Sequence, residues 1–180
     1  MEEKNREVSS LDLPPSFTTF LMDEWGIERL HPPQASAIPS ILGGENTLVA
    51  IPTASGKSLL AYMGMVKRLA EGHERSKAIY IVPLKALAME KYEDLKEIGQ
   101  AMGLSVGLGI GDATAEAKNI DDCNILICTS EKLDSLLRHR SELVADVCCV
   151  VADEFHLMND GSRGPTLEIN LTRLRHIKPD

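Results

Sequence analysis

The chain has 180 residues, of which 43% are hydrophobic and 26% are charged, and its formal net charge at pH 7 is −8. This composition predicts one soluble domain with a buried core. The acidic balance excludes a protein that binds nucleic acid by bulk electrostatics, because such domains are basic over a whole face. It does not exclude a local binding groove.

No segment reaches the run of about 18 apolar residues that a membrane span needs, and the first six residues are too polar and acidic for a signal peptide. We therefore expect a cytoplasmic protein. The cysteines have no C-x-x-C spacing, so we expect reduced thiols and no structural metal site. They are Cys123, Cys128, Cys148 and Cys149, and the last three lie in apolar runs typical of buried strands.

Two helices are predicted near the N-terminus. The first covers residues 16–25, after two prolines and before Gly26, which is the usual placement of proline and glycine around a helix. The second begins at Pro33 and ends at Gly43. Pro39 lies inside it and predicts a kink or an early break.

From residue 47 onward, short apolar runs alternate with longer helical stretches. The expected strands are 47–51, 78–82, 105–109, 124–128 and 147–152. The expected helices are 57–71, 85–102, 130–139 and 165–176. This alternation predicts an α/β fold whose mostly parallel sheet is covered by helices on both faces. In such folds the ligand site lies outside the carboxyl ends of the strands.

A loop of small residues lies between the expected strand 47–51 and the expected helix 57–71. It consists of Pro52, Thr53, Ala54, Ser55 and Gly56, followed by Lys57 and Ser58. In a phosphate loop, the backbone N–H groups wrap a polyphosphate, the lysine neutralises its charge, and the hydroxyl binds magnesium. Ile51 stands where the pattern G-x-x-x-x-G-K-S/T has its first glycine. A Gly-Lys pair that only caps a helix is the alternative.

A second acidic motif follows the apolar run 147–152. Asp153 and Glu154 place two carboxylates at a strand terminus. An aspartate in this position can hold magnesium, and the adjacent glutamate can orient or deprotonate an attacking water molecule. A solvated strand end is the alternative. Together with the phosphate loop, the pair makes Lys57, Asp153 and Glu154 the candidate catalytic residues.

These motifs resemble those of the superfamily-two DExH helicases, Ski-two-like branch, and most closely the archaeal DNA helicases of that branch. The resemblance runs from about Phe20 to about Arg173. Pro32-Pro33-Gln34 resembles the adenine-reading Q motif, residues 52–58 resemble motif I, and residues 153–156, which end in His156, resemble motif II. The resemblance implies that His156 couples this motif to others.

Further matches resemble the segments that hold one nucleic-acid strand in this family. The corresponding residues are Pro83, Leu84 and Lys85 (motif Ia), Gly111 and Asp112 (a glycine-bearing turn), and Thr129, Ser130 and Lys132 (motif Ib). Arg163-Gly164 resembles a stretch that follows motif II. Backbone N–H groups at helix starts and short hydroxyl side chains need few lysines to bind phosphates, which is compatible with the net charge. Plain helix capping is the alternative for Thr129 and Ser130.

The resemblance implies a three-layer RecA-like P-loop NTPase domain over residues 31–180, the first of two, incomplete at its C-terminus because it stops before motif III. Residues 1–30 would form an N-terminal extension whose helix packs on that domain.

Gln34 would read the N6 and N7 edge of adenine; an amide facing solvent is the alternative. The implied cofactors are ATP and Mg²⁺, with Ser58 and Asp153 as metal ligands. At least two of Phe17, Phe20 and Trp25 are expected in the core rather than near the base.

The resemblance implies the ATP-binding half of an ATP-dependent DNA helicase that acts in repair or at stalled replication forks. Its partners would be single-stranded or forked nucleic acid, with DNA favoured, and a second RecA-like domain in cis. An RNA helicase of the same branch and a non-motor P-loop nucleotide-binding module are the alternatives. We expect the isolated chain to bind adenine nucleotide weakly and hydrolyse it barely, because the arginine finger lies on the second domain.

Overall fold

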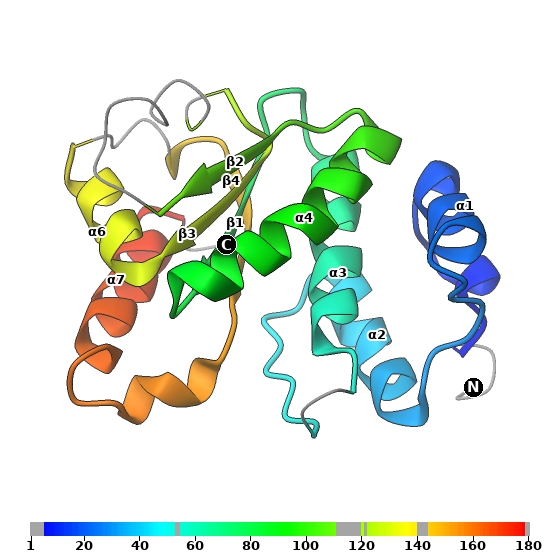
Figure 1. Ribbon diagram of the computed structural model, residues 1–180, viewed down its shortest axis with the longest axis horizontal. Coiled ribbons are helices and arrows are strands. Elements are labelled where there is room, and N and C mark those ends of the chain that lie inside the picture. Colours follow the sequence, from blue (N-terminus) through cyan, green and yellow to red (C-terminus); the bar gives the residue numbers. More distant parts are fainter. Residues whose placement is uncertain (1–5, 53–54, 111–119, 121, 140–143, 179–180) are drawn as a thin grey trace. The chain divides into compact units, whose positions relative to one another are not determined.

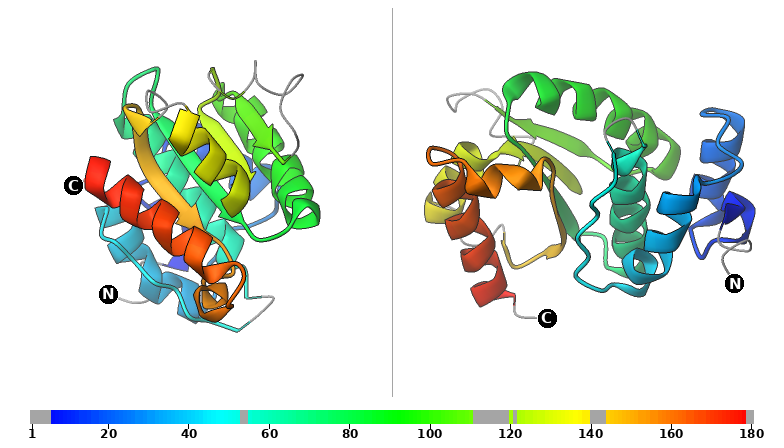
Figure 2. Two further views of the ribbon diagram at one scale, coloured as in Figure 1. Left: turned by 90° about the vertical axis from the view of Figure 1, so that its left-hand side faces the viewer. Right: turned by 90° about the horizontal axis from the view of Figure 1, so that it is seen from below.

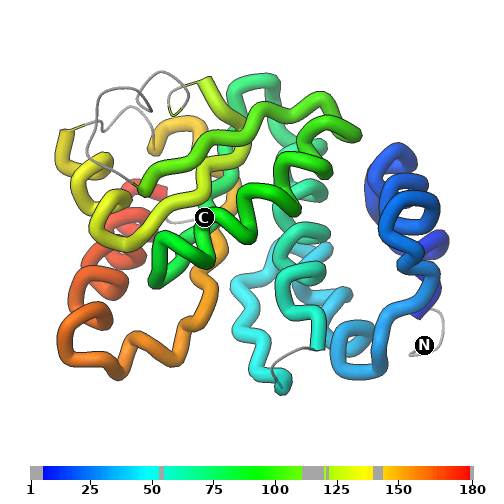
Figure 3. The backbone as a smooth tube through the Cα atoms, in the orientation of Figure 1, coloured from blue at the N-terminus to red at the C-terminus, as the bar shows by residue number. Residues whose placement is uncertain are grey.

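The computed structural model describes residues 6–52, 55–110, 120, 122–139 and 144–178 (Figures 1 and 3). The chain divides into two compact units, Met1–His73 and Glu74–Asp180. The first is helical, and the second contains a sheet with its covering helices. In the described part of the chain, every helix is too short or too polar to span a bilayer.

The described residues of the N-terminal unit form three helices and a short 3-10 turn. The turn η2 is Val8–Ser10, and the helices are α1 (Pro15–Asp23), α2 (Pro32–Gly43) and α3 (Lys57–Glu71). Helices α2 and α3 pack closely where Gly64 of α3 faces Ile41 of α2. A Cβ atom at Gly64 would lie 2.8 Å from Ile41 Cγ2, so a larger residue would push the helices apart.

Helix α2 runs through Pro39 to Gly43, so the predicted early break there is wrong. The proline removes one backbone hydrogen bond, and the packing of α2 on α3 outweighs that local loss. The helix ends where expected, because Gly44 adopts the left-handed conformation with φ of +81°.

The segment 47–51 was expected to be a strand, and this prediction is wrong. The segment has no regular secondary structure, and Leu48 is 72% exposed. A strand needs a neighbour to bond its N–H and C=O groups. Among the described residues of the N-terminal unit, no strand lies beside this segment.

The C-terminal unit contains a four-stranded sheet in the order β2-β3-β1-β4. The strands are β1 (Lys77–Val82), β2 (Val106–Gly109), β3 (Ile125–Thr129) and β4 (Val147–Ala152). All three pairings are parallel, which confirms the predicted sheet type. The carboxyl ends of these strands therefore meet at one edge of the sheet.

Helices cover both faces of this sheet, as Figure 2 shows. Helix α4 (Lys85–Met102) packs over β2 and β3 on one face. Helices α6 (Ser130–His139) and α7 (Gly164–Ile177) lie on the other, where their leucines form a core with alternate residues of β1 and β3. The arrangement is the three-layer α/β architecture that the sequence predicts.

The cysteines are distributed differently from the prediction. Cys123 and Cys128 are buried, but Cys148 is exposed and Cys149 only partly buried. The expectation of buried thiols on β4 is wrong because, within the described sheet, β4 is an edge strand with a neighbour on one side only. Burial raises the pKa of the Cys128 thiol to about 12, so this thiol stays protonated and unreactive.

Candidate functional site

The phosphate-loop sequence ends at the start of α3. Gly56 caps the helix with φ of +71°, a left-handed conformation that glycine adopts without strain. Lys57 is the first residue of the helix, and its Nζ donates a hydrogen bond to the Ile51 carbonyl oxygen at 3.1 Å. Thr53 and Ala54 lie outside the described residues. The helix start expected after the loop is thus present, with N–H groups and a lysine that suit a phosphate.

Gln34 contacts this loop directly. The residue is 3% exposed, so the alternative of an amide facing solvent is wrong. Its Oε1 accepts a hydrogen bond from the His31 backbone N–H at 2.8 Å, and its Nε2 donates to the Gly56 carbonyl oxygen at 3.2 Å. A Cβ atom at Gly56 would collide with Gln34 Nε2. Gln34 therefore joins the start of α2 to the phosphate loop.

An open hollow lies beside Gln34 and Gly56 in the N-terminal unit. It is lined by Gly26, Ile27, Glu28, Arg29, His31, Gln34, Gly56 and Leu59. Phe17 and Phe20 are buried in the core, with ring centroids 6.4 Å apart, and this confirms the expectation for two of the three aromatics. Neither of these two rings belongs to the lining of the hollow.

The acidic motif begins where β4 ends. The Asp153 N–H donates to the Ile81 carbonyl oxygen at 2.9 Å, so the backbone ladder continues one residue past the strand. Asp153 Oδ1 accepts a hydrogen bond from the Glu154 N–H at 2.8 Å, and Oδ2 accepts one from the Tyr80 hydroxyl at 3.0 Å. Both carboxylate oxygens are thus held at the carboxyl end of the sheet, each with a second lone pair remaining.

Glu154 adopts an unfavourable backbone conformation. Its φ of +51° is the only positive value at a non-glycine residue in the described part of the chain. Such conformations are costly for residues with a Cβ atom, and they cluster at functional sites. Glu154 Oε2 lies 3.1 Å from Nδ1 of His156, in the 3-10 helix η4 (Phe155–Asn159), so the structure pairs two residues of the predicted motif.

A tight turn joins η4 to α7. Asp160 Oδ1 accepts hydrogen bonds from the Ser162 hydroxyl at 2.6 Å and from the N–H groups of Ser162 and Arg163 at 2.9 Å each. At Gly164 a Cβ atom would collide with the Met158 carbonyl oxygen, which explains the glycine of the Arg163-Gly164 pair. Sequence reasoning missed Asp160, although the Asp160-Gly161 pair is a recognised turn signal.

The hydrogen bonds from Ser162 and Arg163 lower the pKa of Asp160 to about 2. Because the folded pKa lies below the unfolded value, the ionised carboxylate stabilises the turn above about pH 4, and this contribution disappears as the pH falls through about 2. We expect Asp160→Asn to lower the melting temperature at pH 6, with a difference from wild type that shrinks between about pH 4 and 2. A carboxyl titration near pH 4 by NMR would contradict this.

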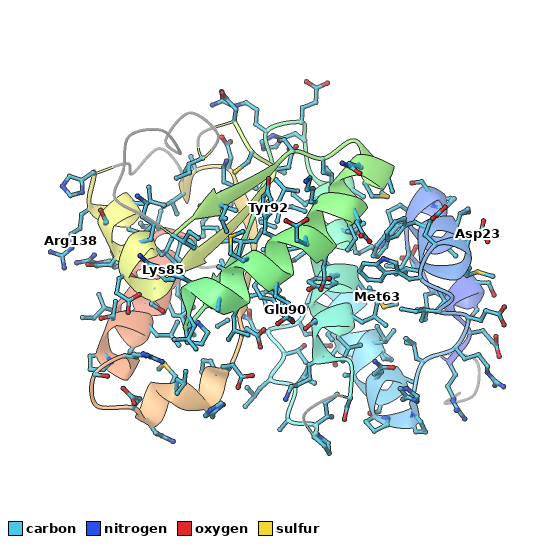
Figure 4. All side chains as sticks on the ribbon, in the orientation of Figure 1. Asp23, Met63, Lys85, Glu90, Tyr92 and Arg138 are labelled. Carbon is cyan, nitrogen blue, oxygen red and sulfur yellow. The ribbon has the colours of Figure 1, made fainter. Side chains whose placement is uncertain are left out.

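Two helix starts follow the adjacent strands β1 and β3. Lys85 is exposed at the start of α4 (Figure 4). Thr129 and Ser130 are buried at the start of α6. Thr129 Oγ1 accepts a hydrogen bond from the Lys132 N–H at 3.4 Å, as a helix cap does. The Ser130 carbonyl oxygen accepts one from Asn170 Nδ2 at 2.7 Å. Thr129 thus serves as a cap, and its predicted phosphate contact stays a prediction, as do those of Pro83, Leu84, Lys85, Ser130 and Lys132.

A small hollow at the carboxyl ends of β1 and β4 brings three of the predicted motifs together. Its lining includes Pro83 of motif Ia, Ser130 of motif Ib, Asp153 and Glu154 of motif II, and Arg163. Gly111 and Asp112 of the predicted glycine-bearing turn lie outside the described residues. Within the C-terminal unit, the nucleic-acid segments expected from the sequence therefore adjoin the acidic motif.

Comparison with known proteins places these motifs in a family. The sequence model described as DEAD/DEAH box helicase matches residues 31–180. The protein named ATP-dependent DNA helicase Hel308 of Methanocella arvoryzae is 47% identical over 176 residues, which are 95% of this chain and 23% of that protein. Hel308 of Pyrococcus abyssi is 48% identical over 155 residues, 86% of this chain and 21% of that protein.

A solved structure shows the same fold. The crystal structure of the DUF1998 helicase MrfA bound to DNA and AMPPNP matches 92% of this chain and 24% of its own, with a TM-score of 0.78 and 28% sequence identity. The chain thus spans less than a quarter of each of these proteins. The matches confirm the resemblance to the Ski-two-like DExH helicases and the RecA-like fold. This chain belongs to the DEAD/DEAH box helicase family.

Proposed function

We propose that this chain is the ATP-binding motor domain of an ATP-dependent DNA helicase. The observation that carries the proposal is the likeness, over 95% of the chain, to a protein named as an ATP-dependent DNA helicase, with the phosphate-loop lysine at a helix start. The Asp153-Glu154 pair at the strand end supports it, because a nucleotide-hydrolysing motor needs both features. A role in repair or at stalled replication forks belongs to the same proposal.

In this proposal, each site residue has a distinct role. Lys57 and the N–H groups of the loop from Pro52 to Gly56 neutralise and hold the phosphates, and Gln34 reads the adenine while fixing Gly56. Glu154 orients or deprotonates the attacking water. The strained backbone that directs Glu154 out of the strand is compatible with that task.

The oxygen donors of Ser58 and Asp153 fit Mg²⁺, which prefers hard oxygen ligands and binds few protein groups. Asp153 uses one lone pair of each oxygen for its hydrogen bonds and keeps the others for the metal or its water. When bound, the metal neutralises charge on the β and γ phosphates.

The nucleic-acid part of the proposal concerns one strand held at the carboxyl edge of the sheet. The MrfA structure, which contains DNA, supports it by likeness of fold. The contacts would come from the helix starts at Lys85 and Ser130, with the segments around them: Pro83, Leu84, Gly111, Asp112, Thr129 and Lys132. A second RecA-like domain in cis would supply the arginine that stabilises the transition state.

ATP hydrolysis by the full-length protein tests this function. The rate is measured without nucleic acid, with single-stranded DNA and with single-stranded RNA, alongside translocation along each strand. We expect DNA to stimulate hydrolysis at least about 10-fold and to support translocation. Stimulation by RNA alone would indicate an RNA helicase instead. Tight nucleotide binding with no response to either strand would indicate a non-motor nucleotide-binding module.

A further inference from the structure

Tyr80 of β1 contacts the acidic motif from inside the sheet. The residue is 1% exposed, and its hydroxyl donates a hydrogen bond to Asp153 Oδ2 at 3.0 Å. The sheet register explains the contact. Tyr80 lies opposite Val151 of β4, and Asp153 follows two residues later, so both side chains lie on the same face of the sheet.

The contact leaves Asp153 little freedom. The Tyr80 hydroxyl holds one carboxylate oxygen, the Glu154 N–H holds the other, and the Asp153 N–H is bonded to Ile81. Two donors on opposite oxygens fix the rotation of the carboxylate plane. A buried ring inside a parallel sheet is a rigid support, so the hydroxyl is placed more exactly than a surface side chain would be.

A hydrogen bond that orients a carboxylate can strengthen Mg²⁺ binding by that carboxylate. Mg²⁺ demands nearly ideal octahedral geometry, so a carboxylate that is already oriented binds it with a smaller loss of conformational freedom. Groups that hydrogen-bond a metal ligand typically change metal affinity or activity about 10- to 100-fold when they are removed. The Tyr80 hydroxyl is such a group for Asp153.

We propose that Tyr80 is a positioning residue that orients Asp153 for the magnesium of the bound nucleotide. This inference rests on the proposed function. A purely structural role is the competing account, because buried tyrosine hydroxyls need a partner and Asp153 provides one. The two accounts differ in what happens when only the oxygen atom of Tyr80 is removed.

The test is the Mg²⁺ dependence of nucleotide binding by the full-length protein carrying Tyr80→Phe. Binding of a fluorescent ATP analogue is titrated with Mg²⁺, and the melting temperature is measured in parallel. We expect the Mg²⁺ concentration for half-maximal effect to rise about 10-fold, while binding in EDTA is unchanged. Tyr92→Phe, which removes a hydroxyl from α4 in the same unit, is the matched control and should behave as wild type.

A double substitution separates the outcomes. On an Asp153→Ala background, Tyr80→Phe should have no further effect on the Mg²⁺ dependence, because the carboxylate that the hydroxyl would orient is gone. An equal effect on both backgrounds would overturn the inference, as would a Tyr80→Phe protein that differs from wild type in melting temperature alone. If wild type binds the analogue without any Mg²⁺ dependence, the proposed magnesium site fails, and the role of Tyr80 fails with it.

Discussion

Lys57→Ala in the full-length protein is expected to weaken ATP binding by at least about 100-fold while leaving the melting temperature close to that of wild type. The lysine is the cation at the start of α3, where the phosphates are proposed to bind. The charge-assisted hydrogen bonds that the lysine would make to phosphate are stronger than hydrogen bonds between neutral groups. In the structure, Lys57 Nζ donates one hydrogen bond, to the Ile51 carbonyl oxygen. Losing it should lower the free energy of unfolding by only about 1 kcal/mol.

Isothermal titration calorimetry with ATP measures this effect. Lys67→Ala is the matched control, because Lys67 lies on the same helix and its Nζ pairs with Asp12 at 2.6 Å and Glu71 at 3.1 Å. Removing it takes away surface ion pairs, which contribute little, and should leave the ATP affinity unchanged. An unaltered affinity in Lys57→Ala would remove the phosphate-loop assignment.

Glu154→Gln is expected to lower the rate of ATP hydrolysis by at least about 100-fold without loss of ATP binding. The substitution keeps the shape of the side chain and removes the carboxylate that would activate the water, a contribution of about 10²- to 10⁴-fold in enzymes of this kind. Single-turnover hydrolysis and equilibrium binding separate the two effects. Glu93→Gln, an exposed glutamate on α4, is the control and should hydrolyse ATP at the wild-type rate.

The backbone at Glu154 adds a stability prediction. With φ of +51°, the backbone conformation of Glu154 is higher in free energy than the same conformation at a glycine. Glu154→Gly should therefore be as inactive as Glu154→Gln and more stable than it by about 1 kcal/mol, measured by urea unfolding. A Gly variant less stable than the Gln variant would show that the left-handed conformation at this position carries no strain.

The helices of this chain were largely predictable from local features. The bounds of α3, α4 and α6 match the predicted ranges, because each begins after a small-residue loop or a strand end and carries apolar residues at helical spacing. β4 was also predicted at its observed bounds, from a continuous apolar run that stops at two carboxylates. These signals lie within a few neighbouring residues.

Features that depend on distant partners were not predictable in the same way. The segment 47–51 has a strand-like composition, but pairing requires a neighbouring strand that its own residues do not specify. The exposure of Cys148 follows from the edge position of β4, which the run Val147–Ala152 cannot reveal. The hydroxyl of Tyr80 reaches Asp153 because of the register between β1 and β4. The hydrogen bond between Gln34 and Gly56 joins residues that are 22 positions apart, so the local sequence could not predict it either.

Lys57 and Asp153 belong to different units of the chain, and the proposed function assigns both to one Mg·ATP site. The most direct measurement is the affinity of the full-length protein for ATP with Mg²⁺ and with EDTA, in wild type, Lys57→Ala and Asp153→Asn. We expect Mg²⁺ to strengthen binding in wild type, Asp153→Asn to bind ATP equally with and without Mg²⁺, and Lys57→Ala to bind poorly in both. An Asp153→Asn protein that keeps the full wild-type response to Mg²⁺ would contradict a shared site.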